Sequence, residues 1–327
     1  MKKFIFQFLG FFLIFSILSF VTGKFLLPQK IYWGNQMYQC KVNDVTADTS
    51  KYDIAFFGSS RIATGIRPAL FDSIINSSYP SKIKSYNFAT FGTWFSENDY
   101  LFNHFIHDSL LHKKIKYVVM EFQNVMSIKW DKISTNKVTY YQNTDNLSFI
   151  YKYSKEKGST SIFKYMPFYL IAYYENLLNL GKSEVLFYDT TYKKEYGEQG
   201  FAKVKENPEK LKVDIDNMYK SIKTYQNTDS SYAGKLLLQK AKNLILELKN
   251  ENIKLIWILP PVKVTKEFMA AFQAIPEENK INLINTDYYP FFYDKELWND
   301  NIHFNLKGAD LLTTTAAKLF LKKIQND

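Results

Sequence analysis

The sequence predicts an α/β fold, in which a parallel sheet of about five strands is covered by helices on both faces. Short apolar runs alternate along the chain with segments of helical periodicity. Strands that alternate with helices pair in parallel and are buried on both faces. Polar residues that can carry chemistry follow several of these runs, as they do at the carboxyl edge of parallel sheets.

The first half of this fold contains three expected strands and two expected helices. The strands are Tyr52–Phe57, Ile83–Phe88 and Ile115–Phe122. A helix from Pro68 to Ile75 begins with a proline, which suits the first turn. Another runs from about Ser96, its expected N-cap, to Leu111.

A largely helical insertion is expected between about residues 125 and 229. Its helices are Ser161–Leu180 and Leu211–Thr224, separated by the polar segment Lys193–Gly200. Because the insertion is rich in Tyr and Phe, it should pack on other parts of the protein. Strands and helices then alternate again: helix Tyr232–Asn250, strand Lys254–Leu259, helix Thr265–Ala274, strand Ile281–Asn285 and helix Leu306–Ile324.

The N-terminal segment predicts a membrane anchor. Eighteen uncharged residues from Phe4 to Val21 follow Lys2 and Lys3. As a helix they would span about 27 Å, close to the ~30 Å hydrocarbon core of a bilayer. The positive-inside rule then places the rest of the chain outside the cytoplasm of the cell. A cleaved signal peptide is the alternative, with the cut before Lys24, but its apolar core is usually shorter.

We therefore expect a single-pass protein of the cell membrane with three regions. Residues 1–23 form the anchor or signal segment, residues 24–50 a juxtamembrane linker, and residues 51–324 the folded domain with its insertion.

Composition excludes several classes of function. The formal charge of +10 comes almost wholly from scattered lysines, with Arg61 and Arg67 as the only arginines, so no nucleic-acid surface is expected. A single cysteine, Cys40, permits neither an intramolecular disulfide nor a cysteine-based metal site. His104 and His107 are spaced like metal ligands, but without an acidic cluster nearby we interpret them as surface or packing residues.

Three residues have the types and chain positions of a serine-based catalytic site. Ser60 follows the first strand, and Asp300 and His303 lie in the loop before the last helix. Nucleophilic serine needs a base within hydrogen-bond reach and a third group that orients the base. At a spacing of three residues, Asp300 can reach one ring nitrogen of His303 while the other faces Ser60.

An anionic intermediate on such a serine would need hydrogen-bond donors. The backbone N–H groups of Ser60 and Gly92 and the side-chain amide of Asn124 are the candidates for this oxyanion hole. Glycine at 92 permits the close backbone approach that such a donor requires. Asn87 is interpreted as a structural residue of the same loop.

The order of these blocks resembles the SGNH (GDSL-type) hydrolase superfamily. The similar blocks are Gly58-Ser59-Ser60, the segment from Asn87 to Gly92, and Asp300-Asn-Ile-His303 with Asn305 and Gly308. The resemblance covers about residues 52–324 apart from the insertion. It implies a three-layer α/β/α, flavodoxin-like fold, a Ser60–His303–Asp300 triad, the oxyanion donors above, and neither metal nor organic cofactor.

Two departures from the family pattern bear on function. Ser59 stands where many members have Asp, a variant similar to membrane-anchored, extracytoplasmic members linked to O-acylation of cell-surface polymers. The third block, Phe122-Gln123-Asn124-Val125, lacks the usual Gly and Asp, which weakens the assignment of Asn124. Two alternatives stay open for the serines: Ser60 as a mere helix cap, and Ser59 as the nucleophile.

Two further residues are candidates for substrate binding. Arg61 either grips a carboxylate or phosphate of the substrate or forms a structural ion pair, whereas for Arg67 we expect the ion pair. Trp298, two residues before Asp300, is the aromatic residue expected to stack on a sugar. Asn305 and Gly308 are expected to start and pack the last helix.

The sequence thus favours transfer of a small acyl group, with acetyl as the leading candidate, to hydroxyls of an exported or envelope polysaccharide. The expected partners are the polysaccharide or acyl-ester substrate, the membrane and a membrane-bound acyltransferase. A hydrolytic carbohydrate esterase or lipase is one alternative. A non-catalytic binding component of a membrane complex is another, although it would not need all three triad residues.

Overall fold

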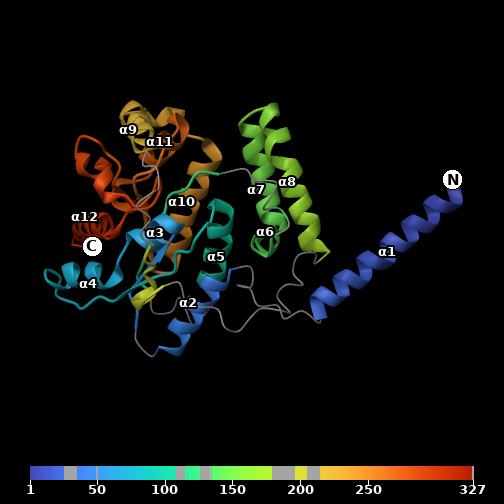
Figure 1. The fold of residues 1–327 in the computed structure, drawn as a ribbon, viewed down its shortest axis with the longest axis horizontal. Coiled ribbons are helices and arrows are strands. Elements are labelled where there is room, and N and C mark those ends of the chain that lie inside the picture. The colour runs from blue at the N-terminus through green and yellow to red at the C-terminus, as the bar shows by residue number, and fades with distance from the viewer. Residues whose placement is uncertain are drawn as a thin grey trace. The chain divides into compact units, whose positions relative to one another are not determined.

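A computed structural model describes residues 1–25, 35–48, 51–107, 115–125, 133, 135–178, 196–204 and 214–325. The chain divides into two compact units. The sheet unit comprises residues 40–125 and 194–327, and the anchor unit comprises residues 1–39 and 126–193. Figure 1 shows the elements of both units.

The sheet unit is built on five parallel strands, as the sequence predicts. The strands are β1 (Ile54–Phe57), β2 (Ser85–Asn87), β3 (Tyr117–Glu121), β4 (Lys254–Leu259) and β5 (Lys280–Asn282), in the order β2-β1-β3-β4-β5. Because the order reverses beside β1, the chain leaves β1 and β3 in opposite directions at their carboxyl ends. Ligands of open parallel sheets bind at such a switch point.

Helices pack against both faces of this sheet. Neighbouring residues of a strand point to opposite faces. Phe56 contacts Phe71, whose ring contacts Phe320, at centroid distances of 5.0 and 5.3 Å. On the other face, the ring centroids of Phe57 and Phe105 lie 4.9 Å apart. The α-helices that lie wholly in the sheet unit are α3 (Ser60–Gly65), α4 (Pro68–Asn76), α5 (Phe95–His107), α9 (Asp214–Tyr225), α10 (Lys235–Asn250), α11 (Lys266–Gln273) and α12 (Leu306–Ile324).

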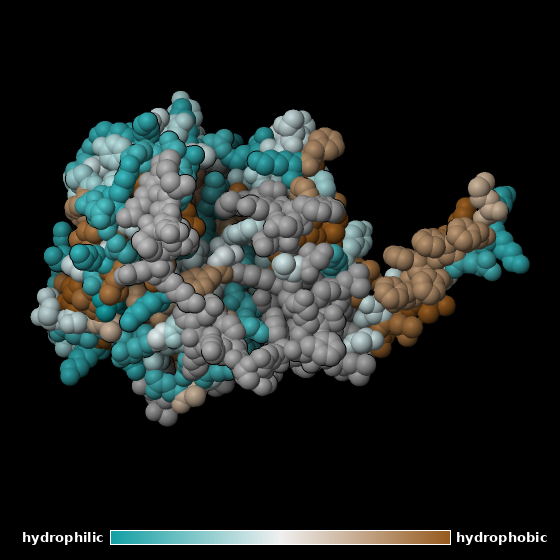
Figure 2. Space-filling model, in the orientation of Figure 1, coloured by the Kyte–Doolittle hydropathy of each residue, from teal (hydrophilic) through white to brown (hydrophobic). Residues whose placement is uncertain are grey.

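All the regular secondary structure described in the anchor unit is helical. It contains α1 (Lys2–Phe25), α6 (Asn136–Tyr141), α7 (Thr144–Glu156) and α8 (Ser159–Leu177). Residues Lys2–Thr22 of α1 form a helix long and apolar enough to cross a membrane. The hydrophobic side chains of α1 from Phe4 to Val21 are exposed (Figure 2).

Two of the expected boundaries differ from the structure. The linker expected at residues 24–50 contains a 12-residue helix, α2 (Gln36–Ala47), which buries Met37, Tyr38 and Lys41. The expected insertion is divided between the units, because α9 belongs to the sheet unit. The expected helix ends at Leu111 and Leu180, the helix start at Leu211 and the polar residue Lys193 lie outside the described residues.

A buried carboxylate joins α4 to β2 and makes the stability of the sheet unit depend on pH. Asp72 accepts hydrogen bonds from the backbone N–H and hydroxyl of Ser85 (3.0 and 2.5 Å) and from the amide of Gln199 (2.9 Å). Burial raises the pKa of Asp72 to about 6, although the hydrogen bonds from Ser85 and Gln199 oppose the shift. The folded protein therefore takes up this proton at a higher pH than the unfolded chain does.

We expect Asp72 to contribute more stability as the pH falls from about 7 towards 4, because the unfolded carboxyl protonates only near pH 4. The Asp72→Asn variant cannot make this gain. The melting temperature of the wild type should therefore rise relative to that of the variant as the pH is lowered. Thermal unfolding of both proteins at several pH values measures the difference. A difference that stays constant with pH would contradict the raised pKa.

Candidate active site

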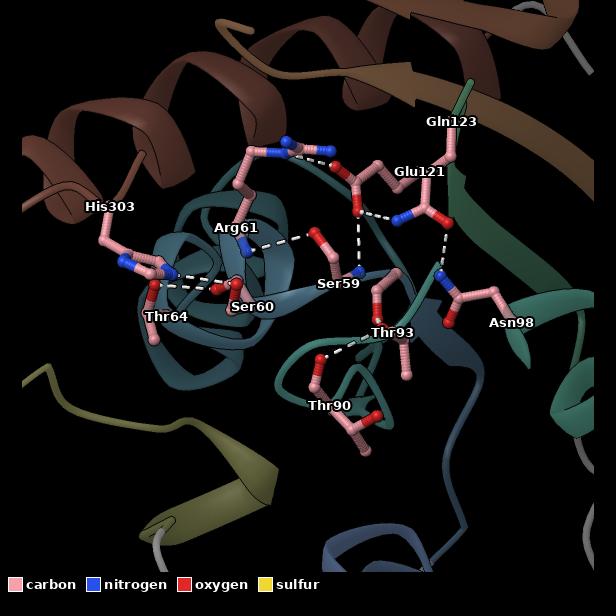
Figure 3. Close-up of polar contacts among 11 residues, drawn as sticks. Ser59, Ser60, Arg61, Thr64, Thr90, Thr93, Asn98, Glu121, Gln123 and His303 are labelled. Atoms are coloured by element: carbon pink, nitrogen blue, oxygen red, sulfur yellow. Dashed lines mark hydrogen bonds and ion pairs between the residues drawn. The ribbon is translucent and has the colours of Figure 1, made fainter. Parts of the chain in front are cut away.

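The turn between β1 and α3 presents Ser60 at the carboxyl end of the sheet. Ser59 is the N-cap of α3, and its hydroxyl accepts a hydrogen bond from the N–H of Arg61 at 3.3 Å. Ser60 is the first residue of the helix, and its Oγ lies 2.8 Å from Nε2 of His303 (Figure 3). The capping role thus belongs to Ser59, which is buried, whereas the hydroxyl of Ser60 faces a base.

The loop before α12 holds the base and its orienting carboxylate. Nδ1 of His303 lies 2.8 Å from Oδ2 of Asp300 and 3.0 Å from Oδ1. Oδ1 of Asp300 also accepts the backbone N–H groups of Ile302 and His303, each at 2.9 Å. Ser60, His303 and Asp300 therefore form one hydrogen-bonded chain, in the order that the sequence predicts.

The environment of Asp300 keeps its carboxylate ionised. Burial acts to raise the pKa of Asp300, but the hydrogen bond with the ring of His303 and those from the two backbone N–H groups outweigh it. The pKa consequently lies well below the usual range of an aspartic acid. An ionised Asp300 holds the Nδ1 proton of His303, which leaves Nε2 as the acceptor towards Ser60.

The loop that follows β2 is fixed from two sides. The side chain of Asn87 is fully buried and donates to the carbonyl oxygens of Ile62 and Ile66 at 2.9 and 3.0 Å, a structural role as predicted. The ammonium of Lys41, also fully buried, donates to the carbonyl oxygens of Asn87 and Ala89 at 2.9 and 2.6 Å. Burial lowers the pKa of Lys41.

The three predicted oxyanion donors differ from one another in their surroundings. Within the described part of the chain, the backbone N–H groups of Ser60 and Gly92 make no hydrogen bond. Gly92 is exposed and has a φ of 62°, a conformation that favours glycine. Asn124 is half-buried just beyond β3, and its side chain has no hydrogen-bond partner among the described residues. Among the described residues, no hydrogen bond connects Asn124 to the turn between β1 and α3.

A buried carboxylate beside the turn between β1 and α3 was not predicted. The side chain of Glu121, at the end of β3, is completely buried. Its Oε2 accepts the backbone N–H of Ser59 at 2.6 Å, and its Oε1 pairs with Nε of Arg61 at 2.7 Å (Figure 3). A Cβ at Gly58 would lie only 2.8 Å from Oε2, so glycine there makes room for the carboxylate.

A relay of amides continues from Glu121 to α5. The amide of Gln123 donates to Oε2 of Glu121 at 3.0 Å, and the amide of Asn98 donates to the side-chain oxygen of Gln123 at 2.5 Å. Gln123 and Asn98 are both buried. The one sign of this network in the sequence is an acidic residue, Glu121, near the end of the apolar run Ile115–Phe122.

Removal of the Glu121 carboxylate should destabilise the fold. Glu121→Ala leaves Arg61 and the N–H of Ser59 without their partner, and breaking a buried ion pair costs about 3–5 kcal/mol. We expect the free energy of unfolding, measured by chemical denaturation, to fall by about that amount. The matched control is Asp310→Ala, because the Asp310–Arg67 pair is partly exposed and should contribute about 0–1 kcal/mol. Equal losses in the two variants would contradict the interpretation.

The other predicted residues fall into two groups. Arg61 and Arg67 form ion pairs with Glu121 and Asp310, so the structural alternative is realised for both, while the Arg61 side chain keeps 23% of its surface exposed. Trp298 is only 1% exposed, packs against the tilted ring of Phe304 and donates from its ring N–H to the carbonyl of Phe292. The prediction that Trp298 stacks on a sugar is therefore wrong for this structure, because the ring has no free face.

The start of α12 is as expected. Asn305 caps the helix by accepting the N–H of Gly308 at 3.0 Å. A Cβ at Gly308 would lie 2.3 Å from the carbonyl oxygen of Leu297, so this residue is a packing glycine.

The described residues contain no cluster of three or more His, Cys, Asp or Glu side chains that could hold a metal ion. His104 instead lies against the ring of Tyr100, at a centroid distance of 4.5 Å. The chain was also compared with known proteins. No protein-family model matches it, and neither does any curated protein.

Proposed function

We propose that the chain is a membrane-anchored serine O-acyltransferase with an SGNH-like, three-layer α/β/α domain. It would transfer a small acyl group, such as acetyl, to hydroxyls of an exported or envelope polysaccharide. The observation that carries the proposal is the continuous hydrogen-bonded chain from Oγ of Ser60 through His303 to Asp300. This arrangement suits a serine that forms a covalent acyl intermediate.

In the first half of the reaction, Nε2 of His303 takes the proton of Ser60 while Oγ attacks the acyl carbonyl. The negative charge on the carbonyl oxygen would be met by the N–H groups of Ser60 and Gly92 and by the amide of Asn124. His303 then gives its proton to the leaving alcohol, and the acyl group stays on Ser60 as an ester.

In the second half, a sugar hydroxyl is the nucleophile. His303 takes the proton of this hydroxyl, the hydroxyl oxygen attacks the acyl-serine, and His303 returns the proton to Oγ of Ser60. The free enzyme and an acylated sugar result. Water in place of the sugar would give hydrolysis, which is the reaction of the esterase alternative.

The anchor supports an extracytoplasmic site. If α1 spans the membrane with Lys2 and Lys3 on the cytoplasmic side, the sheet unit faces the compartment in which envelope polysaccharides are modified. An acyl donor would have to reach that compartment, so a membrane-bound acyltransferase is the partner that the reaction needs. Many SGNH members have Asp where this chain has Ser59. The serine is similar to that of membrane-anchored SGNH members linked to O-acylation, and it also favours the proposal.

Transfer and hydrolysis can be separated in one assay. Full-length protein in detergent micelles is incubated with 4-nitrophenyl acetate, with and without an oligosaccharide acceptor, and both nitrophenol and acetylated glycan are measured. We expect release of nitrophenol and acetylation of the glycan, both absent in Ser60→Ala. Free cleavage of the ester without any acetylated glycan would overturn the transferase assignment, and no turnover at all would favour a non-catalytic component.

A further inference from the structure

Helix α8 carries an exposed apolar stripe. Phe163 is 78% exposed, Tyr174 57%, Leu177 43%, and Leu170 and Ile171 38% each. The spacings from Phe163 are seven, eight, eleven and fourteen residues, which place the five side chains on one face of the helix. A soluble surface helix normally turns such a face towards a core.

The opposite face of α8 already has its core. Tyr169 and Ala172 are buried, and α8 packs along α7, whose Ile150 and Tyr153 are also buried. The side-chain amide of Asn176 donates to the carbonyl oxygen of Gln142 at 2.7 Å, which fixes the rotation of α8 about its own axis. The apolar stripe is therefore held away from the helical core of the anchor unit.

The stripe is continuous with the membrane-spanning helix. The hydroxyl of Ser19 donates to the carbonyl oxygen of Leu178, the residue that ends α8. Ser19 lies near the end of the apolar span Lys2–Thr22, at the extracytoplasmic side in the proposed orientation. The C-terminal end of α8 consequently lies at the depth where the anchor leaves the hydrocarbon core.

The polar groups around the stripe suit a lipid surface. Tyr174 has an amphipathic ring of the kind that is enriched at membrane interfaces. Lys164, directly after Phe163 on α8, is also exposed. Helices that lie in the plane of an interface combine an apolar face with such lysines, which attract anionic headgroups.

We infer that α8 lies in the outer interface of the bilayer, with its stripe from Phe163 to Leu177 among the headgroups and upper acyl chains. Interfacial helices bury their apolar faces to a depth of about 5–10 Å. The anchor unit would then hold the membrane at two places, by the spanning helix α1 and by the in-plane helix α8. Surface hydrophobic side chains are visible over both helices in Figure 2. The inference does not depend on the proposed reaction.

A fluorescence experiment on the full-length protein tests this position. In a Cys40→Ser background, single cysteines are introduced by Leu170→Cys and Tyr174→Cys in the stripe. The controls are Lys155→Cys on α7 and Leu246→Cys on α10, because Leu246 is an equally apolar residue that is 60% exposed in the sheet unit. Each cysteine is labelled with the environment-sensitive dye NBD, and the protein is reconstituted into vesicles of phosphatidylcholine and phosphatidylglycerol.

Quenching from the two phases separates the outcomes. We expect dyes at 170 and 174 to be quenched by nitroxide-labelled lipid and several-fold less by aqueous iodide than the dyes at 155 and 246. Equal iodide quenching at all four positions would overturn the inference. Protection of 170 and 174 from both quenchers would overturn it as well, because the stripe would then be covered by protein, either a partner or a second copy. The two stripe positions are independent, so one poorly folding variant leaves the other informative.

Discussion

Replacement of Ser60 by alanine is expected to abolish acyl transfer, with kcat falling by a factor on the order of 10⁶, as loss of the serine does in other serine enzymes. Without Oγ no acyl intermediate can form, because His303 has no other hydroxyl within hydrogen-bond distance in the described residues. Labelling of the protein by a fluorophosphonate probe should disappear together with the activity.

The matched control is Ser59→Ala, next to Ser60 in the chain. Loss of the hydroxyl of Ser59 removes an N-cap and should cost about 1 kcal/mol of stability. Because this loss of stability is small, we expect the Ser59→Ala variant to stay folded and to be labelled by the fluorophosphonate probe. If labelling survives in Ser60→Ala and disappears in Ser59→Ala, then Ser59 is the nucleophile and Ser60 is not.

Replacement of Asp300 by asparagine should lower kcat by about 10⁴-fold with the protein still folded. The amide would donate to Nδ1 of His303 and so leave the proton on Nε2, which can then no longer accept the proton of Ser60. Steady-state cleavage of 4-nitrophenyl acetate measures the loss. Asp310→Asn, the same change in a surface ion pair, should leave kcat unchanged.

The acid dependence of stability provides a second readout for Asp300. Because its folded-state pKa is lowered, Asp300 contributes stability that is present above the unfolded pKa, near pH 4, and is lost in stronger acid as the folded carboxylate protonates. Asp300→Asn should therefore be less stable than the wild type at neutral pH and approach it in strong acid. A variant that keeps full activity would show that Asp300 does not orient His303.

The regular part of the fold could be predicted from sequence. Strand Lys254–Leu259 and helix Leu306–Ile324 have the predicted bounds, because continuous apolar runs and helical periodicity both report burial directly. Helix α2 was missed because its residues alternate polar and apolar types without a clear apolar face. The helix is buried by contacts with residues far away in the chain, such as the hydrogen bond from Lys41 to the carbonyl oxygen of Asn87. The periodicity of a sequence does not report such contacts.

The site was predictable where chemistry depends on spacing and order, and less so where it depends on side-chain direction. Asp300 and His303 are close in the chain, so their pairing follows from one turn of backbone. Trp298 is equally close, yet the antiparallel pairing of Trp298 with Phe304 turns its ring into the core. Glu121 lies sixty residues from Arg61, and only the adjacency of β1 and β3 brings the two together.

Lys41 determines how far the chain can be shortened from its N-terminus. Its ammonium holds two carbonyl oxygens of the loop that carries Gly92, although it precedes the first strand by more than ten residues. A cut at residue 51, which removes everything before the sheet, would leave those carbonyls without donors. A truncated protein for crystallisation or assay should therefore begin at about residue 35, so that α2 and its lysine are retained while the long apolar helix α1 is removed.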